Sequence, residues 1–110
     1  LRKLGMPVNT VNCGGSRDLI TQEREQWHSG ANFFAVAPGK VLGYGRNVNT
    51  LEELSRHGFE IVRAKDVVNG KADVDSYNKC VIAIDGAELS RGGGGCRCMT
   101  MPVNRDAVDW

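Results

Sequence analysis

Short apolar runs bounded by turn residues recur along the chain, and they predict β-strands. Residues 32–37 and 40–44 are two such runs, and Pro38-Gly39 between them fits the central positions of a type II turn, so this stretch predicts a hairpin. Residues 80–84 form a continuous apolar run that is typical of a buried strand. Residues 59–62 roughly alternate between apolar and polar positions and predict another strand.

A charged stretch early in the chain predicts the first helix, from residue 17 to residue 27, with Ser16 as its N-cap. Ser29-Gly30 is a typical helix end. Leu19, Ile20, Glu23 and Trp27 are expected to share one side of this helix, so its apolar stripe is thin, and the other side is charged. The three consecutive charged residues Glu23, Arg24 and Glu25 are expected to face solvent.

The second predicted helix starts with a capping-box pattern. Thr50 would be the N-cap and Glu53 the acid three residues later. Leu51 and Leu54 supply its apolar side, and Gly58 is expected to end it just after His57.

Other stretches have weaker patterns. Residues 6–12 and 98–103 predict short strands, and residues 85–88 predict one turn of helix. Residues 67–79 are polar and predict a loop or insertion, and residues 104–110 form a polar tail. The order of elements indicates a mixed α/β fold, in which residues 32–62 run strand, strand, helix, strand.

Size and composition fit a small globular unit. The chain has 110 residues, 41% of them hydrophobic and 25% charged, with a formal net charge of +1. No linker divides it, so residues 1–110 are treated as one unit without an internal domain boundary. The charge balance gives no sign of a nucleic-acid or membrane partner. Because no secretory segment is visible and the cysteines fit reduced thiols, we expect a cytoplasmic protein. The first residue, Leu1, is not methionine, which suggests a piece of a longer protein.

Four cysteines leave several interpretations open. Their uneven spacing and the absence of a recognisable secretory segment favour reduced thiols over disulfides. A zinc site is the other alternative, but Cys96-Arg97-Cys98 lacks the usual C-x-x-C spacing and no histidine lies nearby. We therefore expect no metal and no cofactor.

The most informative stretch is a run of four glycines, Gly92, Gly93, Gly94 and Gly95, followed by Cys96-Arg97-Cys98. Such a backbone comes close to a ligand easily, and a thiol beside it is well placed to be a nucleophile. Arg91 and Arg97 could lower the pKa of that thiol and favour the reactive thiolate. The run lacks the Gly-Lys-Ser/Thr of a phosphate-binding loop.

The two histidines are weak candidates for a general base. His57 is expected at the end of a capped helix, where the helix dipole favours a cation, and His28 follows Trp27 at another helix end. On these residues alone, the chain offers a nucleophile without its base.

Several motifs together resemble the C-terminal part of the arginine deiminases. They are Cys13-Gly14-Gly15, Arg24-Glu25-Gln26-Trp27, Gly30-Ala31-Asn32, Ala37-Pro38-Gly39, Arg46-Asn47, Arg91-Gly92-Gly93-Gly94-Gly95 and Arg97-Cys98-Met99-Thr100-Met101-Pro102. They occur in the right order over essentially the whole chain. Ser29 departs from the family pattern, which usually has an acid at that place.

The resemblance implies the guanidino-modifying (pentein) α/β propeller, built from strand-strand-helix-strand modules. It implies that Cys98 is the catalytic cysteine, that Cys96 is a bystander, and that residues 92–95 belong to a mobile loop that closes over the substrate. The implied reaction is the hydrolysis of L-arginine to L-citrulline and ammonia through a covalent amidino-cysteine. The family's base and guanidinium-binding acids lie upstream, so this chain alone is expected to be inactive.

Alternative functions stay open. One is a non-catalytic module that binds a partner or forms oligomers through an exposed apolar face. Another is a small domain stabilised by zinc on the four cysteines. A third is a related enzyme of the same superfamily that acts on agmatine or transfers an amidino group.

Overall fold

A mixed four-stranded sheet forms the centre of the protein. The computed structural model describes residues 1–107, and the last part of the predicted polar tail, residues 108–110, lies outside this range. The strands are β1 (Phe34–Ala37), β2 (Lys40–Tyr44), β3 (Glu60–Arg63) and β4 (Cys80–Ile84), in the spatial order β1-β2-β4-β3. β1 is antiparallel to β2, whereas β2 and β3 both run parallel to β4. The predicted α/β fold class is confirmed.

The predicted hairpin is confirmed. β1 and β2 are joined by Pro38-Gly39, and Gly39 has a φ of +73°, the value that a type II turn requires at its second central residue. A side chain there would lie 2.6 Å from the carbonyl oxygen of Asn78, so glycine is needed for space as well. The parallel partner β4 starts beside this turn, where the N–H of Cys80 donates to the Gly39 carbonyl.

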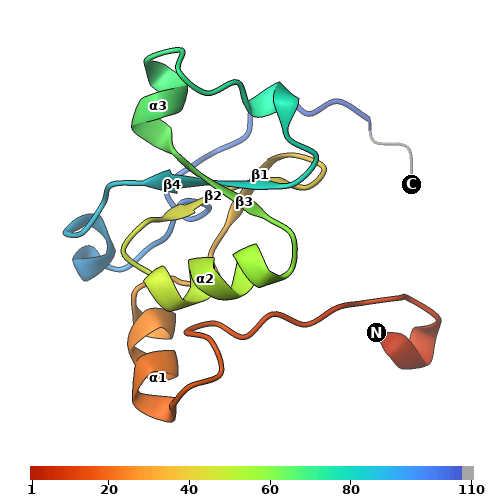
Figure 1. The fold of residues 1–110 in the computed structure, drawn as a ribbon, viewed down its shortest axis with the longest axis vertical. Coiled ribbons are helices and arrows are strands. Elements are labelled where there is room, and N and C mark those ends of the chain that lie inside the picture. Colours follow the sequence, from red (N-terminus) through yellow and green to blue (C-terminus); the bar gives the residue numbers. More distant parts are fainter. Residues whose placement is uncertain (108–110) are drawn as a thin grey trace.

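Helices cover both faces of the sheet (Figure 1). α2 (Val48–Arg56) packs on one face, where Leu51 and Leu54 contact Val81 of β4. α3 (Ala64–Val68) lies toward the other face, where Val62, Cys80 and Ile82 form a second cluster. Successive residues of a strand point to opposite faces, so β4 contributes side chains to both clusters. This explains why its apolar run is uninterrupted.

α1 (Leu19–Trp27) lies beyond α2, away from the sheet (Figure 1). The prediction for its faces was wrong. The supposed apolar side is exposed, with Leu19 at 75%, Ile20 at 80% and Trp27 at 83% of full exposure, whereas Glu25 is 2% exposed. The helix therefore packs on the protein through a carboxylate and leaves its apolar residues free.

Both predicted helix caps were also wrong. Asp18, not Ser16, caps α1, because its side chain accepts a hydrogen bond of 2.7 Å from the N–H of Thr21. α2 starts three residues earlier than predicted, at Val48, which places Thr50 inside the first turn instead of at the cap.

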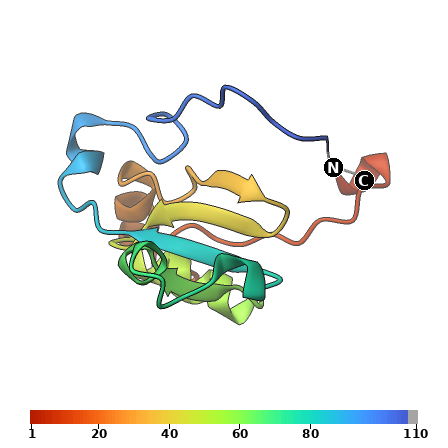
Figure 2. The ribbon, with the colours of Figure 1, turned by 90° about the horizontal axis from the view of Figure 1, so that it is seen from above.

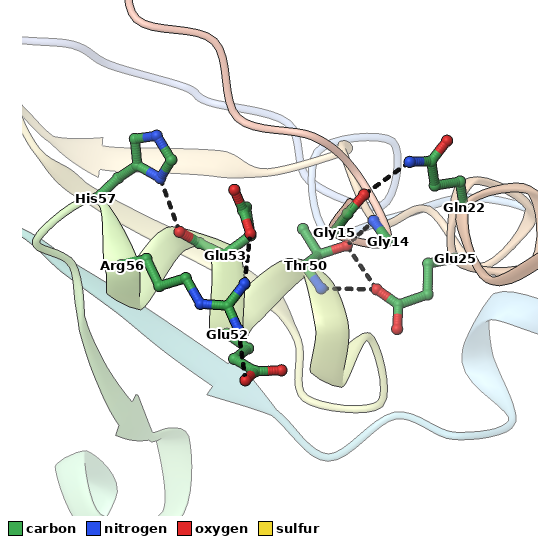
Figure 3. Close-up of polar contacts among 9 residues, drawn as sticks. All are labelled: Gly14, Gly15, Gln22, Glu25, Thr50, Glu52, Glu53, Arg56 and His57. Carbon is green, nitrogen blue, oxygen red and sulfur yellow. Dashed lines mark hydrogen bonds and ion pairs between the residues drawn. The ribbon is translucent and has the colours of Figure 1, made fainter. Parts of the chain in front are cut away.

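The carboxylate of Glu25 caps α2 from outside (Figure 3). It accepts hydrogen bonds from the backbone N–H groups of Asn49 and Thr50 at 3.0 and 2.8 Å, and from their side chains at 2.7 and 2.6 Å. The Thr50 hydroxyl in turn accepts from the N–H of Gly14 at 2.8 Å. A tertiary contact thus replaces the local capping box that the sequence predicted.

Several weaker predictions need correction. Residues 6–12 form no strand, and Val11 packs instead against the cluster between α2 and the sheet. The stretch 67–79 is not a plain loop, since it contains the end of α3 and the 3-10 helix Val74–Ser76. The helical turn predicted at 85–88 lies later, as the 3-10 helix Leu89–Gly92.

The strand predicted at residues 98–103 is wrong. This segment forms turns and bends, and Met101 and Val103 are 82% and 89% exposed. A strand needs a neighbour to pair its backbone groups, and this segment has no ladder partner in the described sheet.

Another 3-10 helix, Arg2–Leu4, precedes the first irregular stretch. Within residues 1–107, no helix is both long and apolar enough to cross a membrane.

Candidate active site

The segment after β4 carries the four glycines and Cys98. The chain leaves the sheet at Ile84, forms the 3-10 helix Leu89–Gly92 and turns at residues 96–99. In Figure 2 this segment is blue and begins at the end of the sheet where β2 and β4 both finish. Gly93 and Gly94 have φ values of +77° and +111°, a backbone that glycine adopts without a steric penalty.

Tyr44, the last residue of β2, and Arg46, two residues later, both form hydrogen bonds with this segment. The Arg46 guanidinium donates to the carbonyl of Ala87 and, at 3.3 Å, to the hydroxyl of Ser90. The buried Tyr44 donates from its phenol to the carbonyl of Gly94 at 3.3 Å. The segment is therefore tied to the sheet on both sides of its first glycines.

Cys98 presents an exposed thiol that is held by a side chain from a distant part of the sequence. The amide Nδ2 of Asn32 donates to the sulfur at 2.8 Å across 66 residues of chain. The turn itself is closed by the N–H of Met99, which donates to the Gly95 carbonyl at 3.2 Å. The sulfur thus has hydrogen-bond donors on its protein side and solvent on the other.

The pKa of the Cys98 thiol is lowered below its usual value. A hydrogen bond from the Gly95 backbone contributes most, the Asn32 amide comes next, and the charge of Arg97 adds a smaller contribution. Burial raises the pKa of each of the other cysteines: Cys13, Cys80 and Cys96. Cys98 is therefore the thiol best suited to react as a thiolate.

An open depression of about 660 Å³ lies beside the sulfur. Its walls come from the end of α1, the approach to β1 and the turn at Cys98. The lining residues are Gln26, Ser29, Ala31, Asn32, Phe33, Arg97 and Cys98. None of these lining side chains is a carboxylate or an imidazole, so in the described chain this surface offers a nucleophile and one cation.

The histidines lie where the sequence predicts them. His28 and His57 are the C-cap residues of α1 and α2, and each ring Nδ1 lies within 3.0 Å of a carbonyl oxygen four residues earlier, 2.6 Å for His28 and 2.9 Å for His57. Neither lines the depression at Cys98. Among residues 1–107, no group of three or more His, Cys, Asp or Glu side chains is arranged to hold a metal ion.

The sequence profile of the arginine deiminase family matches residues 2–105 of this chain. The chain belongs to the arginine deiminase family. It is 39% identical over 102 residues to the arginine deiminase of Mycoplasma capricolum subsp. capricolum, 39% over 105 residues to that of Borrelia duttonii, and 40% over 103 residues to that of Listeria innocua serovar 6a. These alignments cover 93%, 96% and 93% of this chain.

The matched arginine deiminases are much longer proteins. Each alignment covers 20% of the relative, so the chain spans about a fifth of the length of the curated relatives it matches. The resemblance carried by the sequence motifs is thereby confirmed at the level of the family.

The structure places the other predicted site residues at different distances from the thiol. Arg97 lines the depression, and Gly95 is buried beside Asn32. Arg91 forms an exposed ion pair of 2.7 Å with Glu88. Gly92 lies in open space, since a side-chain carbon added there would meet no heavy atom within 4 Å beyond its chain neighbours.

Sequence reasoning missed the part played by Asn32, Tyr44 and Glu25. In the sequence Asn32 belongs to the motif Gly30-Ala31-Asn32, which by itself gives it no role. The co-occurrence of that motif with the cysteine motif is the one signal that the two meet. Glu25 lies in the motif Arg24-Glu25-Gln26-Trp27, but its spacing predicts a solvent-exposed position.

Proposed function

We propose that this chain supplies the nucleophile-bearing C-terminal part of an arginine deiminase, which converts L-arginine and water to L-citrulline and ammonia. The observation that carries the proposal is the exposed thiol of Cys98, with a lowered pKa, at an open depression in a chain of this family. The proteins named arginine deiminase among its relatives support the substrate.

The Cys98 thiolate attacks the guanidinium carbon of arginine, forming a C–S bond and a tetrahedral adduct. One C–N bond then breaks, and the nitrogen leaves as ammonia after accepting a proton, which gives an amidino-cysteine. Water adds to the same carbon, the C–S bond breaks, and the thiolate is restored as citrulline forms. One ammonia is released for each water consumed.

The chain's own residues cover only part of this chemistry. Proton transfer to the leaving nitrogen needs a general acid, and a planar cation needs carboxylates placed to bind it. The lining of the depression provides neither, and the Arg97 guanidinium there would repel a cationic substrate. The upstream part of the same enzyme therefore supplies these groups, and the chain alone is inactive.

The glycine loop, residues 92–95 with Arg91 and Arg97 at its two sides, closes over the bound substrate in this proposal. Gly92 and Gly93 lie in open space, since a side-chain carbon added at either would meet no heavy atom within 4 Å, and this leaves room for the loop to move. The order β1, β2, α2, β3 supports one strand-strand-helix-strand module of a guanidino-modifying propeller. A cytoplasmic location stays a prediction.

The test is citrulline release from L-arginine by this chain alone and after mixing with the upstream part of an arginine deiminase. We expect no product from the chain alone, product from the mixture, and none from a mixture that contains Cys98→Ala. A mixture that gains nothing from this chain would remove the proposal. Agmatine in place of arginine tests the related hydrolases, since an agmatine hydrolase would prefer it.

A non-catalytic binding module is a second candidate, because α1 leaves Leu19, Ile20 and Trp27 exposed. The same surface suits the upstream part of the enzyme. Oligomerisation that rises with concentration and disappears when the upstream part is added would favour the catalytic proposal. Oligomerisation that the upstream part leaves unchanged would favour a separate partner.

A further inference from the structure

We propose that Asn32 is a positioning residue that holds Cys98 ready as a nucleophile by donating a hydrogen bond to its sulfur. The inference rests on the proposed function, since it takes Cys98 to be the nucleophile. The contact joins Nδ2 of Asn32 to Sγ of Cys98 at 2.8 Å. A thiolate only accepts hydrogen bonds, so an amide N–H aimed at it favours the ionised form.

The backbone around Asn32 fixes where its side chain lies. α1 ends in a turn in which the N–H of Gly30 donates to the Glu25 carbonyl at 2.8 Å and the N–H of Asn32 donates to the Ser29 carbonyl at 3.0 Å. A side chain on Gly30 would come within 2.6 Å of the Cys13 sulfur, so the turn is closely packed. Asn32 therefore extends from a hydrogen-bonded and closely packed helix end.

The glycine loop packs directly against this amide. A side chain on Gly95 would lie 2.6 Å from Cβ and 2.7 Å from Cγ of Asn32. Gly95 is also the residue whose backbone contributes the other main hydrogen bond to the Cys98 sulfur. The Asn32 amide and the Gly95 backbone thus lie against each other, and both stabilise the sulfur. The absence of a side chain at Gly95 leaves the space for this arrangement.

The second polar atom of the amide indicates what the side chain is for. Oδ1 of Asn32 is buried and has no hydrogen-bond partner among the described residues. Burying an unpaired carbonyl oxygen is unfavourable, so the amide is not held there by its oxygen. Its one side-chain hydrogen bond within residues 1–107 is the bond to Cys98.

The charged and titratable groups near the Cys98 sulfur are Arg97, Tyr44 and Cys96. Arg97, on the same turn, favours the thiolate through its charge. The phenol of Tyr44 and the thiol of Cys96 are neutral at neutral pH, because burial raises the pKa of each. Asn32 is thus the side chain from outside the turn that stabilises the anion.

The test uses the pH dependence of Cys98 alkylation by iodoacetamide, measured on the intact chain by mass spectrometry of the Cys98 peptide. Two variants change the donor: Asn32→Ala removes it, and Asn32→Asp keeps the shape but presents a carboxylate. We expect alkylation at neutral pH to slow about fivefold for Asn32→Ala, the usual effect of one hydrogen bond, and more for Asn32→Asp. At high pH all rates should converge, because the thiol is then ionised in each protein.

Asn78→Asp is the matched control, since it makes the same chemical change at an exposed position away from the depression. Its alkylation profile should match that of the unchanged chain. Identical midpoints for Asn32→Asp and the unchanged chain would overturn the inference, as would a lower plateau rate with an unmoved midpoint, which indicates altered access only. If Asn32→Ala fails to fold, Asn32→Asp carries the test by itself. Citrulline production plays no part in this readout, so failure of the proposed function is seen separately.

Discussion

The protein holds two hydrogen-bond acceptors in comparable ways but exposes them differently. The Glu25 carboxylate and the Cys98 sulfur each accept hydrogen bonds from a part of the chain distant in sequence. Glu25 is 2% exposed and has four donors, so both of its oxygens accept hydrogen bonds. Figure 3 shows the two that come from Thr50. Cys98 is exposed, and its sulfur has an open side that faces a depression.

In the proposed function, this difference separates a structural anion, Glu25, from a reactive thiolate, Cys98. A carboxylate whose lone pairs are saturated by donors cannot take a proton without losing bonds, and it stabilises the joint between α1 and α2. A thiolate with donors on one side only keeps a lone pair for a substrate carbon. On this proposal, the number of donors and the access to solvent, more than the charge, decide which of the two groups reacts.

The largest expected effect comes from removing the structural anion. Glu25→Ala leaves the N–H groups of Asn49 and Thr50 without their partner, so we expect the free energy of unfolding to fall by about 3 kcal/mol. Urea unfolding followed by circular dichroism measures this. Glu23→Ala, at an exposed position of the same helix, is the control and should change stability by less than about 0.5 kcal/mol. Equal effects of the two variants would contradict the assignment of Glu25.

The glycine beside Asn32 and the Cys98 turn should be the next most sensitive position. Gly95→Ala places a methyl group 2.6 Å from the Cβ of Asn32, so we expect a loss of about 2 kcal/mol and slower alkylation of Cys98. Gly92→Ala has open space and is the control, with a change within about 0.5 kcal/mol. Thermal unfolding and alkylation rates measure both. A Gly95→Ala protein as stable and reactive as Gly92→Ala would refute the close contact.

Acid should weaken the structural anion in a defined direction. Burial alone would raise the pKa of Glu25, but its hydrogen bonds from Thr50 and Asn49 outweigh burial and lower the pKa below the usual 4.5. A depressed pKa contributes stability above the unfolded-state value that is lost as the pH falls through the folded-state value. We therefore expect the urea midpoint to decrease below about pH 4.5, and less so in Glu25→Gln. A midpoint with the same acid dependence in both proteins would argue against Glu25 as the source.

The smallest effect concerns the turn that carries Asn32. Ser29 has a φ of +58°, a left-handed conformation that asparagine tolerates better than serine. Ser29→Asn should therefore raise the free energy of unfolding by about 0.5 kcal/mol, seen as a slightly higher melting temperature. Ser55→Asn, on the exposed side of α2, is the control and should not stabilise. A lower melting temperature for Ser29→Asn would show that the serine hydroxyl matters more than the backbone conformation.

Local sequence patterns predicted the sheet well. The hairpin follows from Pro38-Gly39, and β4 follows from its apolar run, because both signals depend on neighbouring residues only. The faces of α1 and the start of α2 could not be predicted, since both depend on Glu25 reaching a helix 24 residues later in the chain. The strand predicted at 98–103 failed for a similar reason, because strand propensity without a pairing neighbour does not form a ladder.

The sequence pointed to the residues of the candidate site, whereas the contacts between them could not be predicted from it. The glycine run and Cys98 follow from local motifs, and the family resemblance selected Cys98 over Cys96. The contact with Asn32 is long-range, so a single sequence gives no spacing from which to infer it. The ion pair of Arg91 with Glu88 likewise reflects the local 3-10 turn, which the sequence pattern predicted a few residues too early.

The most direct test of Cys98 as the nucleophile is to trap the covalent intermediate. The chain, mixed with the upstream part of an arginine deiminase and given arginine, would be quenched with acid during turnover and its cysteine peptides analysed by mass spectrometry. We predict an amidino adduct on Cys98, unchanged in Cys96→Ala and absent in Cys98→Ala. An adduct on Cys96, or citrulline formed while Cys98 is replaced by alanine, would contradict the account.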